Sequence, residues 1–226
     1  MISSIKKSGF KTIRFPITWM YFIDDYGNIN SSWLEKIKQV VNLIINSNMY
    51  CIINVYGDAD IGNWLLEEEN SLDKYINIWR QISEEFKIYD DHLIFESMNE
   101  IETVNRNEKY LTKLNNLNQV FVDTVRNSDG YNSERLLIVS GSSYISALFP
   151  EIKLPIDISN KLGVSFHYYY PKQFSKIQEN SSLVYIEEKS GYQTNITSQS
   201  TWGTELDYNV FFSNFYQIWI ILINHI

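Results

Sequence analysis

Two hydrophobic periods alternate along the chain. Short continuous apolar runs, such as YCIINVY at 50–56, have the length and β-branched character of strands buried on both faces. Longer segments between these runs repeat apolar residues every three or four positions, as one face of an amphipathic helix does. We therefore expect helices along three apolar stripes: Trp33, Leu34, Ile37, Val40, Val41, Ile44 and Ile45; Tyr75, Ile78, Trp79, Ile82 and Phe86; and Leu111, Leu114, Leu117, Phe121 and Val125.

The same pattern predicts five strands, in segments 11–16, 50–56, 92–98, 135–141 and 162–170. Strands that alternate with helices form a parallel sheet with the helices outside it. Ser32 and Glu35 have the spacing of a capping box, so we expect Ser32 to cap the first long helix. Ser71 is expected to open the second. A chain of 226 residues has room for one sizeable core, which predicts a single domain over 1–226.

The sheet could be open or closed into a barrel. An open sheet that binds nucleotides usually carries a glycine-rich first turn, and neither G-x-G-x-x-G nor G-x-x-x-x-G-K occurs here. In a (β/α)8 barrel the functional side chains follow the carboxyl ends of the strands. Such positions hold Arg14 and Trp19, Tyr56 and Asp58, Asn99 and Glu100, and His167 and Tyr169. Their placement favours an α/β fold of the TIM-barrel type, incomplete, with about five of eight βα units recognisable.

Charge and composition narrow the possible ligands. The net charge is −8 and the isoelectric point is about 4.9, so phosphate backbones and anionic membranes would be repelled and no nucleic-acid partner is expected. A neutral sugar meets no such repulsion, and the aromatic fraction of 15 % could line a groove for one. Cys51 is the single cysteine, and His92, His167 and His225 lie far apart in sequence. Neither a metal site nor a cofactor is therefore expected.

The sequence does not identify a compartment. Its first ten residues, MISSIKKSGF, lack the continuous apolar stretch of a signal peptide. Sequons for N-glycosylation at Asn30, Asn180 and Asn195 arise readily by chance in a chain rich in Asn and Ser. Polar residues interrupt the apolar tail 209–226, so no membrane span is expected there.

Four strand-end motifs, taken in order, carry a family resemblance. IRFPITW, CIINVYGD, HLIFESMNE and VSFHYYYP resemble the successive strand ends of glycoside hydrolase family five, the cellulase family, over most of residues 9–207. The resemblance implies a (β/α)8 barrel and a retaining glycosidase that cleaves a β-1,4-glucan such as cellulose without a cofactor. It also implies an extracellular location.

The resemblance assigns roles to five residues. Glu100 matches the acid/base, which must carry a proton before it can protonate the leaving oxygen. Asn99 matches the residue that hydrogen-bonds the 2-hydroxyl of the sugar. Arg14 matches the arginine that supports the charge of the nucleophile, and His167 and Tyr169 match the pair that shapes the same site. The competing interpretation of Asn99 and Glu100 is a solvent-exposed helix cap.

Aromatic residues are candidates for substrate binding. Trp202 resembles a loop tryptophan that could stack on a sugar face, and packing is an equal interpretation of it. Tyr56 stands where the family has a histidine beside the catalytic carboxylates. Trp64, in a strand-to-helix loop, is the best remaining candidate, whereas Trp19 and Trp79 are assigned to the core.

The chain departs from the family pattern around the candidate acid/base. Tyr56 and Gly57 replace two histidines, and Ile101 stands where proline usually follows the acid/base. Glu96 lies inside its strand, so we expect it to make a supporting polar contact rather than to catalyse.

No nucleophile is identified. The segment 171–207 is interpreted as a loop insertion, and its Glu187 and Glu188 are not expected to be the second carboxylate. A typical barrel needs about 250 residues, so the chain is expected to be truncated at both ends, with exposed barrel edges that could cause self-association. A rival hypothesis is an inactive, truncated relic with at most weak carbohydrate binding. An unrelated α/β enzyme would need a cofactor or phosphate motif, and none occurs.

Overall fold

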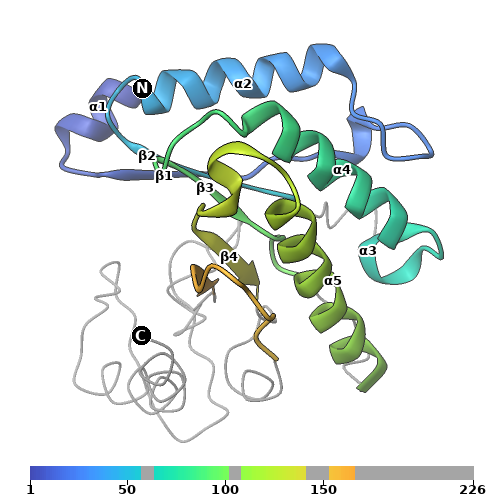
Figure 1. Ribbon diagram of the computed structural model, residues 1–226. Helices are drawn as coiled ribbons and strands as arrows, with labels where there is room; N and C mark the ends of the chain where they lie inside the picture. Colours follow the sequence, from blue (N-terminus) through green and yellow to red (C-terminus); the bar gives the residue numbers. More distant parts are fainter. Residues whose placement is uncertain (57–63, 102–107, 141–152, 166–226) are drawn as a thin grey trace, which may run out of the picture. The chain divides into compact units, whose positions relative to one another are not determined.

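The computed structural model describes residues 1–56, 64–101, 108–140 and 153–165, which all belong to one compact unit of the chain. Within them, five strands form one parallel sheet in the order β1-β2-β3-β4-β5 (Figure 1). The strands are β1 Thr12–Phe15, β2 Tyr50–Asn54, β3 Leu93–Glu96, β4 Leu137–Ser140 and β5 Leu162–Ser165. Each predicted strand is present, and the predicted parallel sheet is confirmed.

Helices separate the first four strands in sequence. They are α1 Ile2–Lys7, α2 Ser31–Ile45, α3 Trp64–Glu67, α4 Ser71–Phe86 and α5 Glu108–Arg126, with short 3-10 helices η1 Met20–Phe22 and η3 Gly130–Ser133. The strand order follows the sequence without a reversal, so right-handed connections place the long helices on one face of the sheet. A doubly wound open sheet reverses its order at a switch point. The sheet therefore matches part of a (β/α)8 barrel, as predicted.

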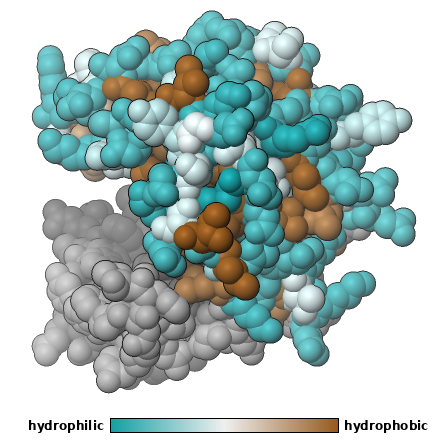
Figure 2. All heavy atoms as spheres, viewed as in Figure 1, coloured by the Kyte–Doolittle hydropathy of each residue, from teal (hydrophilic) through white to brown (hydrophobic). Residues whose placement is uncertain are grey.

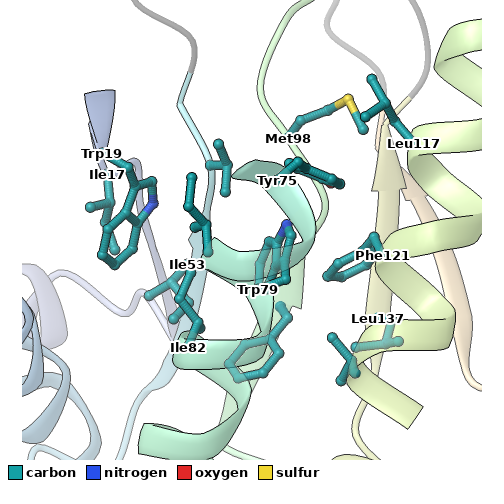
Figure 3. Close-up of a cluster of buried hydrophobic side chains, with 14 of the residues drawn as sticks. Ile17, Trp19, Ile53, Tyr75, Trp79, Ile82, Met98, Leu117, Phe121 and Leu137 are labelled. Atoms are coloured by element: carbon teal, nitrogen blue, oxygen red, sulfur yellow. The ribbon is translucent and has the colours of Figure 1, made fainter. Parts of the chain in front are cut away.

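The core lies between the sheet and the helices (Figure 3). Side chains alternate along a strand, so Phe95 of β3 points toward α4 while its neighbour Glu96 points to the other face. The ring centroid of Trp79 in α4 lies 5.5 Å from that of Phe95 and 4.5 Å from that of Phe121 in α5. Trp19 and Trp79 are fully buried, which confirms both as core residues.

The predicted helical stripes are the faces that pack on the sheet. In α4 every member of the stripe is buried: Tyr75, Ile78, Trp79, Ile82 and Phe86. The visible face of the molecule is mostly hydrophilic over the helices, with smaller hydrophobic patches (Figure 2). Among the helices that the structure describes, none combines the length and the apolar character that a bilayer span requires.

The start of α2 differs from the prediction. The helix begins at Ser31, and Asn30 rather than Ser32 is its cap. Asn30 Oδ1 accepts hydrogen bonds from the Ser32 amide at 2.9 Å and the Trp33 amide at 3.4 Å. Ser32 is the second residue of the helix rather than the residue before it, and its hydroxyl donates to the same oxygen at 2.7 Å. The capping-box prediction was therefore wrong by two residues, because an Asn before the serines takes the cap. The prediction that α4 opens at Ser71 is confirmed.

Candidate active site

Three neighbouring strands bring polar side chains together toward their carboxyl ends. Arg14 comes from β1, Asn54 from β2 and Glu96 from β3, and Asn54 and Glu96 are direct partners in the strand register. Arg14 Nε donates to Glu96 Oε2 at 2.6 Å, and Asn54 Nδ2 donates to the same oxygen at 2.9 Å. Glu96 is 1 % exposed, and a carboxylate so buried must be paired and hydrogen-bonded. The expected supporting role of Glu96 therefore agrees with its contacts.

Arg14 also reaches the residue that precedes the candidate acid/base. Its Nη2 donates to Asn99 Oδ1 at 2.9 Å, and the Asn99 amide N–H donates to the Val55 carbonyl at 3.0 Å. A guanidinium has donors only, so Asn99 must turn its oxygen toward Arg14, and its two N–H groups point elsewhere. Asn99 is 7 % exposed, which rules out the solvent-exposed helix cap for this residue. Two of the predicted site residues, Arg14 and Asn99, thus lie in contact.

The backbone on both sides of Glu100 is held by side chains from α4, α5 and β4. The Tyr75 hydroxyl donates to the Ser97 carbonyl at 2.8 Å, and the Ser140 hydroxyl donates to the Met98 carbonyl. The Tyr110 hydroxyl donates to the Ile101 carbonyl at 2.5 Å. Glu100 itself is half-buried. The candidate acid/base therefore lies in a loop, residues 97–101, whose course is determined by buried hydrogen bonds.

A second buried network supports the same loop. Ser97 Oγ donates to Asn118 Oδ1 at 2.8 Å, Asn118 Nδ2 donates to the Ser140 carbonyl at 2.9 Å, and the Ser140 amide donates to Ser97 Oγ at 3.0 Å. These residues were not predicted from the sequence. The sequence held one indication of them: the polar residue Asn118 directly follows Leu117, a member of the apolar stripe of α5. In the structure Asn118 is fully buried, and a buried amide needs hydrogen-bond partners.

The remaining predicted site residues have three different outcomes. Tyr56 lies just past β2, where its amide donates to the Ile17 carbonyl at 2.9 Å, and it is half-buried. Trp64 is 2 % exposed within the hydrophobic core. This burial corrects its assignment to substrate binding, because a ring packed on all sides has no face for a sugar. His167, Tyr169 and Trp202 lie outside the described residues, as do the segments 171–207 and 209–226, so their roles stay predictions.

A different group carries the ligand types of a metal site. Within the described ranges, Asp90, Asp91 and His92 bring their donor atoms within 4.8 Å of one another. They precede β3 and so lie at its amino end, whereas Glu96 closes the carboxyl end. His92 Nδ1 is 3.1 Å from Asp90 Oδ1 and its ring stacks on Tyr50. The cluster is therefore separate from the candidate acid/base.

Comparisons with known proteins identify relatives of this arrangement. Residues 1–216 match the model of the family described as Cellulase (glycosyl hydrolase family 5). The chain is 35 % identical to Endoglucanase A of Paenibacillus barcinonensis over 91 % of this chain and 56 % of that protein.

Solved structures of glycosidases from the same family are also similar to this chain. A GH5-4 broad specificity endoglucanase from an uncultured bovine rumen ciliate is 42 % identical, with a TM-score of 0.81 over 97 % of this chain and 62 % of that one. A family 5 xyloglucanase from Paenibacillus pabuli is 32 % identical, with a TM-score of 0.77 over 96 % and 66 %. The chain thus spans about three fifths of the length of these relatives.

Proposed function

Because the chain belongs to the cellulase family, glycosyl hydrolase family 5, we propose that it acts as a retaining endo-β-1,4-glucanase in which Glu100 is the acid/base. The proposal rests on one observation above all: Arg14 binds Asn99 directly beside Glu100, where parallel strands end. Relatives named endoglucanase and xyloglucanase support a β-glucan as the substrate.

Glu100 would perform two proton transfers. In a retaining glycosidase two carboxyl groups stand about 5 Å apart across the scissile bond. Glu100 would protonate the glycosidic oxygen as the bond to the anomeric carbon breaks, and would then take a proton from the water that releases the glycosyl-enzyme. The hydrogen bonds from Tyr75, Ser140 and Tyr110 hold the backbone on both sides of Glu100, and proton transfer requires such a well-positioned acid/base.

Asn99 and Arg14 would stabilise charge during the same steps. The Asn99 oxygen is taken by Arg14, so its N–H groups can donate to the 2-hydroxyl of the sugar, a contact that strengthens as the oxocarbenium-like transition state forms. The Arg14 side chain is 31 % exposed, so part of the guanidinium is open to a neighbouring anion such as the nucleophile.

Glu96 does not fit the part of the nucleophile. Its carboxylate is buried inside β3 and already accepts hydrogen bonds from Arg14 and Asn54, which leaves no approach for an anomeric carbon. We assign the nucleophile to none of the described residues.

Hydrolysis of aryl β-cellobiosides by the protein tests the proposal. We expect Glu100→Gln to lower kcat/KM by about 10³-fold when the leaving group is phenol, because proton donation is lost. The loss should be much smaller with 2,4-dinitrophenol, which leaves without a proton. Glu85→Gln is the matched control, since Glu85 pairs with Lys38 at 2.6 Å on the outer side of the helices.

Equal turnover by the wild type and Glu100→Gln would overturn the assignment of Glu100. Binding of a soluble β-glucan without any turnover would instead favour the inactive relic with weak carbohydrate affinity.

We also propose an extracellular location. A polymeric glucan does not cross a membrane, so an enzyme that cleaves it inside the chain must meet it outside the cell. Activity on β-glucan that stays with washed, lysed cells and is absent from the medium would contradict this location.

A further inference from the structure

Glu96 is an unexpected residue for the inner face of a strand. Ile94, two positions earlier on the same face, shows that an apolar side chain suits that face, yet Glu96 places a carboxylate there at 1 % exposure. Among the described residues it has two donors, Arg14 Nε and Asn54 Nδ2, and both bind the single oxygen Oε2. Burial of a carboxylate is unfavourable without such partners, so packing alone does not account for the residue.

The contacts form a directional chain across three strands. The Ile17 amide donates to Asn54 Oδ1 at 3.3 Å, so Asn54 turns its N–H groups toward Glu96. Glu96 in turn holds Arg14 Nε at 2.6 Å. The guanidinium is planar and rigid, so once its Nε is held, the direction of its Nη2 is determined as well. That direction leads to Asn99 Oδ1 at 2.9 Å.

We propose that Glu96 is a positioning residue, which acts through Arg14 to keep the N–H groups of Asn99 facing the 2-hydroxyl of the substrate. The inference rests on the proposed function. The oxygen and nitrogen of an Asn amide are nearly equal in shape, so sterics alone do not choose between the two orientations. The Arg14 guanidinium can only donate, so when it is held in place it selects the orientation in which the Asn99 oxygen faces it. Without Glu96, Arg14 can turn away and Asn99 can present its oxygen to the hydroxyl.

The dependence of turnover on the 2-hydroxyl measures this positioning. The measured ratio is kcat/KM for an aryl β-cellobioside divided by kcat/KM for the analogue that lacks the 2-hydroxyl on the sugar next to the scissile bond. The intrinsic reactivity of the analogue is the same for all variants, so it cancels when their ratios are compared. A residue that only stabilises the fold would leave this ratio unchanged.

Two substitutions at Glu96 separate geometry from charge. Glu96→Gln keeps an oxygen that can accept from Arg14 and Asn54, and we expect its ratio to stay within about threefold of the wild type. Glu96→Leu removes the acceptor, and we expect the ratio to fall about 30-fold through kcat more than through KM, toward the value of Asn99→Ala.

Asp157→Asn is the matched control. Asp157 also forms a buried ion pair, with Arg126 at 2.7 Å and side chains 4 % and 2 % exposed, but it belongs to the loop before β5. It should lower the melting temperature and leave the ratio unchanged.

Three outcomes would overturn the inference: an unchanged ratio in a folded Glu96→Leu variant, an equal fall in Glu96→Gln and Glu96→Leu, or a fall in Asp157→Asn. Should Glu96→Leu fail to fold, Asn54→Ala decides, since it removes the second anchor of the carboxylate. A lowered ratio supports the inference, and an unchanged one overturns it.

A protein without turnover would defeat the proposed function but not this inference, which a crystal structure of the folded variant still tests. In Glu96→Leu, or in Asn54→Ala, we expect the contact between Arg14 Nη2 and Asn99 Oδ1 to be broken. Its persistence at the wild-type distance would overturn the inference.

Discussion

Two arginines serve opposite ends of the same sheet and are held in different ways. Arg14 lies toward the carboxyl ends of the strands, and between described residues it makes two hydrogen bonds, to the Glu96 carboxylate and to Asn99. Arg135 lies just before β4, at the amino ends, and is 2 % exposed. It donates five hydrogen bonds, to four backbone carbonyls and the Asn132 side chain.

The Arg135 guanidinium is used entirely for structure. Its nitrogens reach the carbonyls of Phe86 and Tyr89, at and beyond the end of α4, and those of Asp90 and Leu93. Helix carbonyl ends carry partial negative charge, which suits a cation. Burial lowers the pKa of Arg135 to about 10, so the side chain is still charged at neutral pH. Its charge holds together the connection between α4 and β3.

The two arginines differ in whether their hydrogen bonds leave any group for a ligand. At the amino ends, Arg135 has every donor satisfied by the chain itself, and nothing is left for a ligand. At the carboxyl ends, Arg14 is part-exposed and binds the side-chain oxygen of Asn99, whose side-chain N–H groups have no partner among the described residues. In (β/α)8 barrels the carboxyl ends carry function and the amino ends carry stability. The two arginines follow that rule.

The largest expected effect is on stability, from Arg135→Lys. A lysine ammonium has three donors on a flexible stem and cannot replace a five-donor fork, so buried carbonyls lose their partners. We expect the free energy of unfolding to fall by about 4 kcal/mol, measured by denaturant titration. Activity per folded molecule should stay at the wild-type level. Arg80→Lys, on the exposed face of α4, is the control and should change little. A catalytic defect without a stability defect would break the comparison.

The opposite result is expected for Arg14→Lys. An ammonium can still pair with Glu96 but cannot hold Glu96 and Asn99 at once, so kcat/KM on a β-glucan should fall by about 100-fold. Thermal unfolding should shift only slightly, because the buried carboxylate keeps a cationic partner. If the variant melts as early as Arg135→Lys, the two ends do not differ in the way described.

The smallest effect concerns acid stability at the amino end. Burial alone would raise the pKa of Asp157, but hydrogen bonds from Arg126 and from the Lys161 and Ser159 amides outweigh burial and lower it. A lowered folded-state pKa adds stability that is complete above the unfolded value of about 4 and is lost as the pH falls through the folded value.

Denaturant titrations from pH 7 to pH 3 would test this. The stability difference between the wild type and Asp157→Asn should be about 2 kcal/mol near neutral pH and shrink below about pH 4. Asp91→Asn, whose side chain is 83 % exposed, serves as the control. A difference that is constant across this range would show that Asp157 does not titrate as described.

Much of the fold was predictable because it follows from short-range pattern. The apolar runs became β1 to β5, and the stripe of α4 is buried throughout. The cap of α2 was misplaced because Asn30, Ser31 and Ser32 are all capable caps, and backbone geometry chose between them. Trp64 was misassigned because it was expected in a loop, whereas it opens α3 and is buried, and its sequence does not show whether the ring faces a ligand or the core.

Local sequence therefore determined the alternation of strands and helices, and the motifs at the strand ends predicted that Asn99 and Glu100 lie at the rim of a barrel. Only the tertiary structure decided that Arg14 holds Asn99, that Glu96 and Asn54 hold Arg14, and that Arg135 binds carbonyls more than forty positions earlier in the chain. Hydrophobic period acts between near neighbours, so it can be seen in the sequence. Hydrogen bonds between distant side chains depend on strand register and on the direction of each donor, which exist only once the sheet has formed.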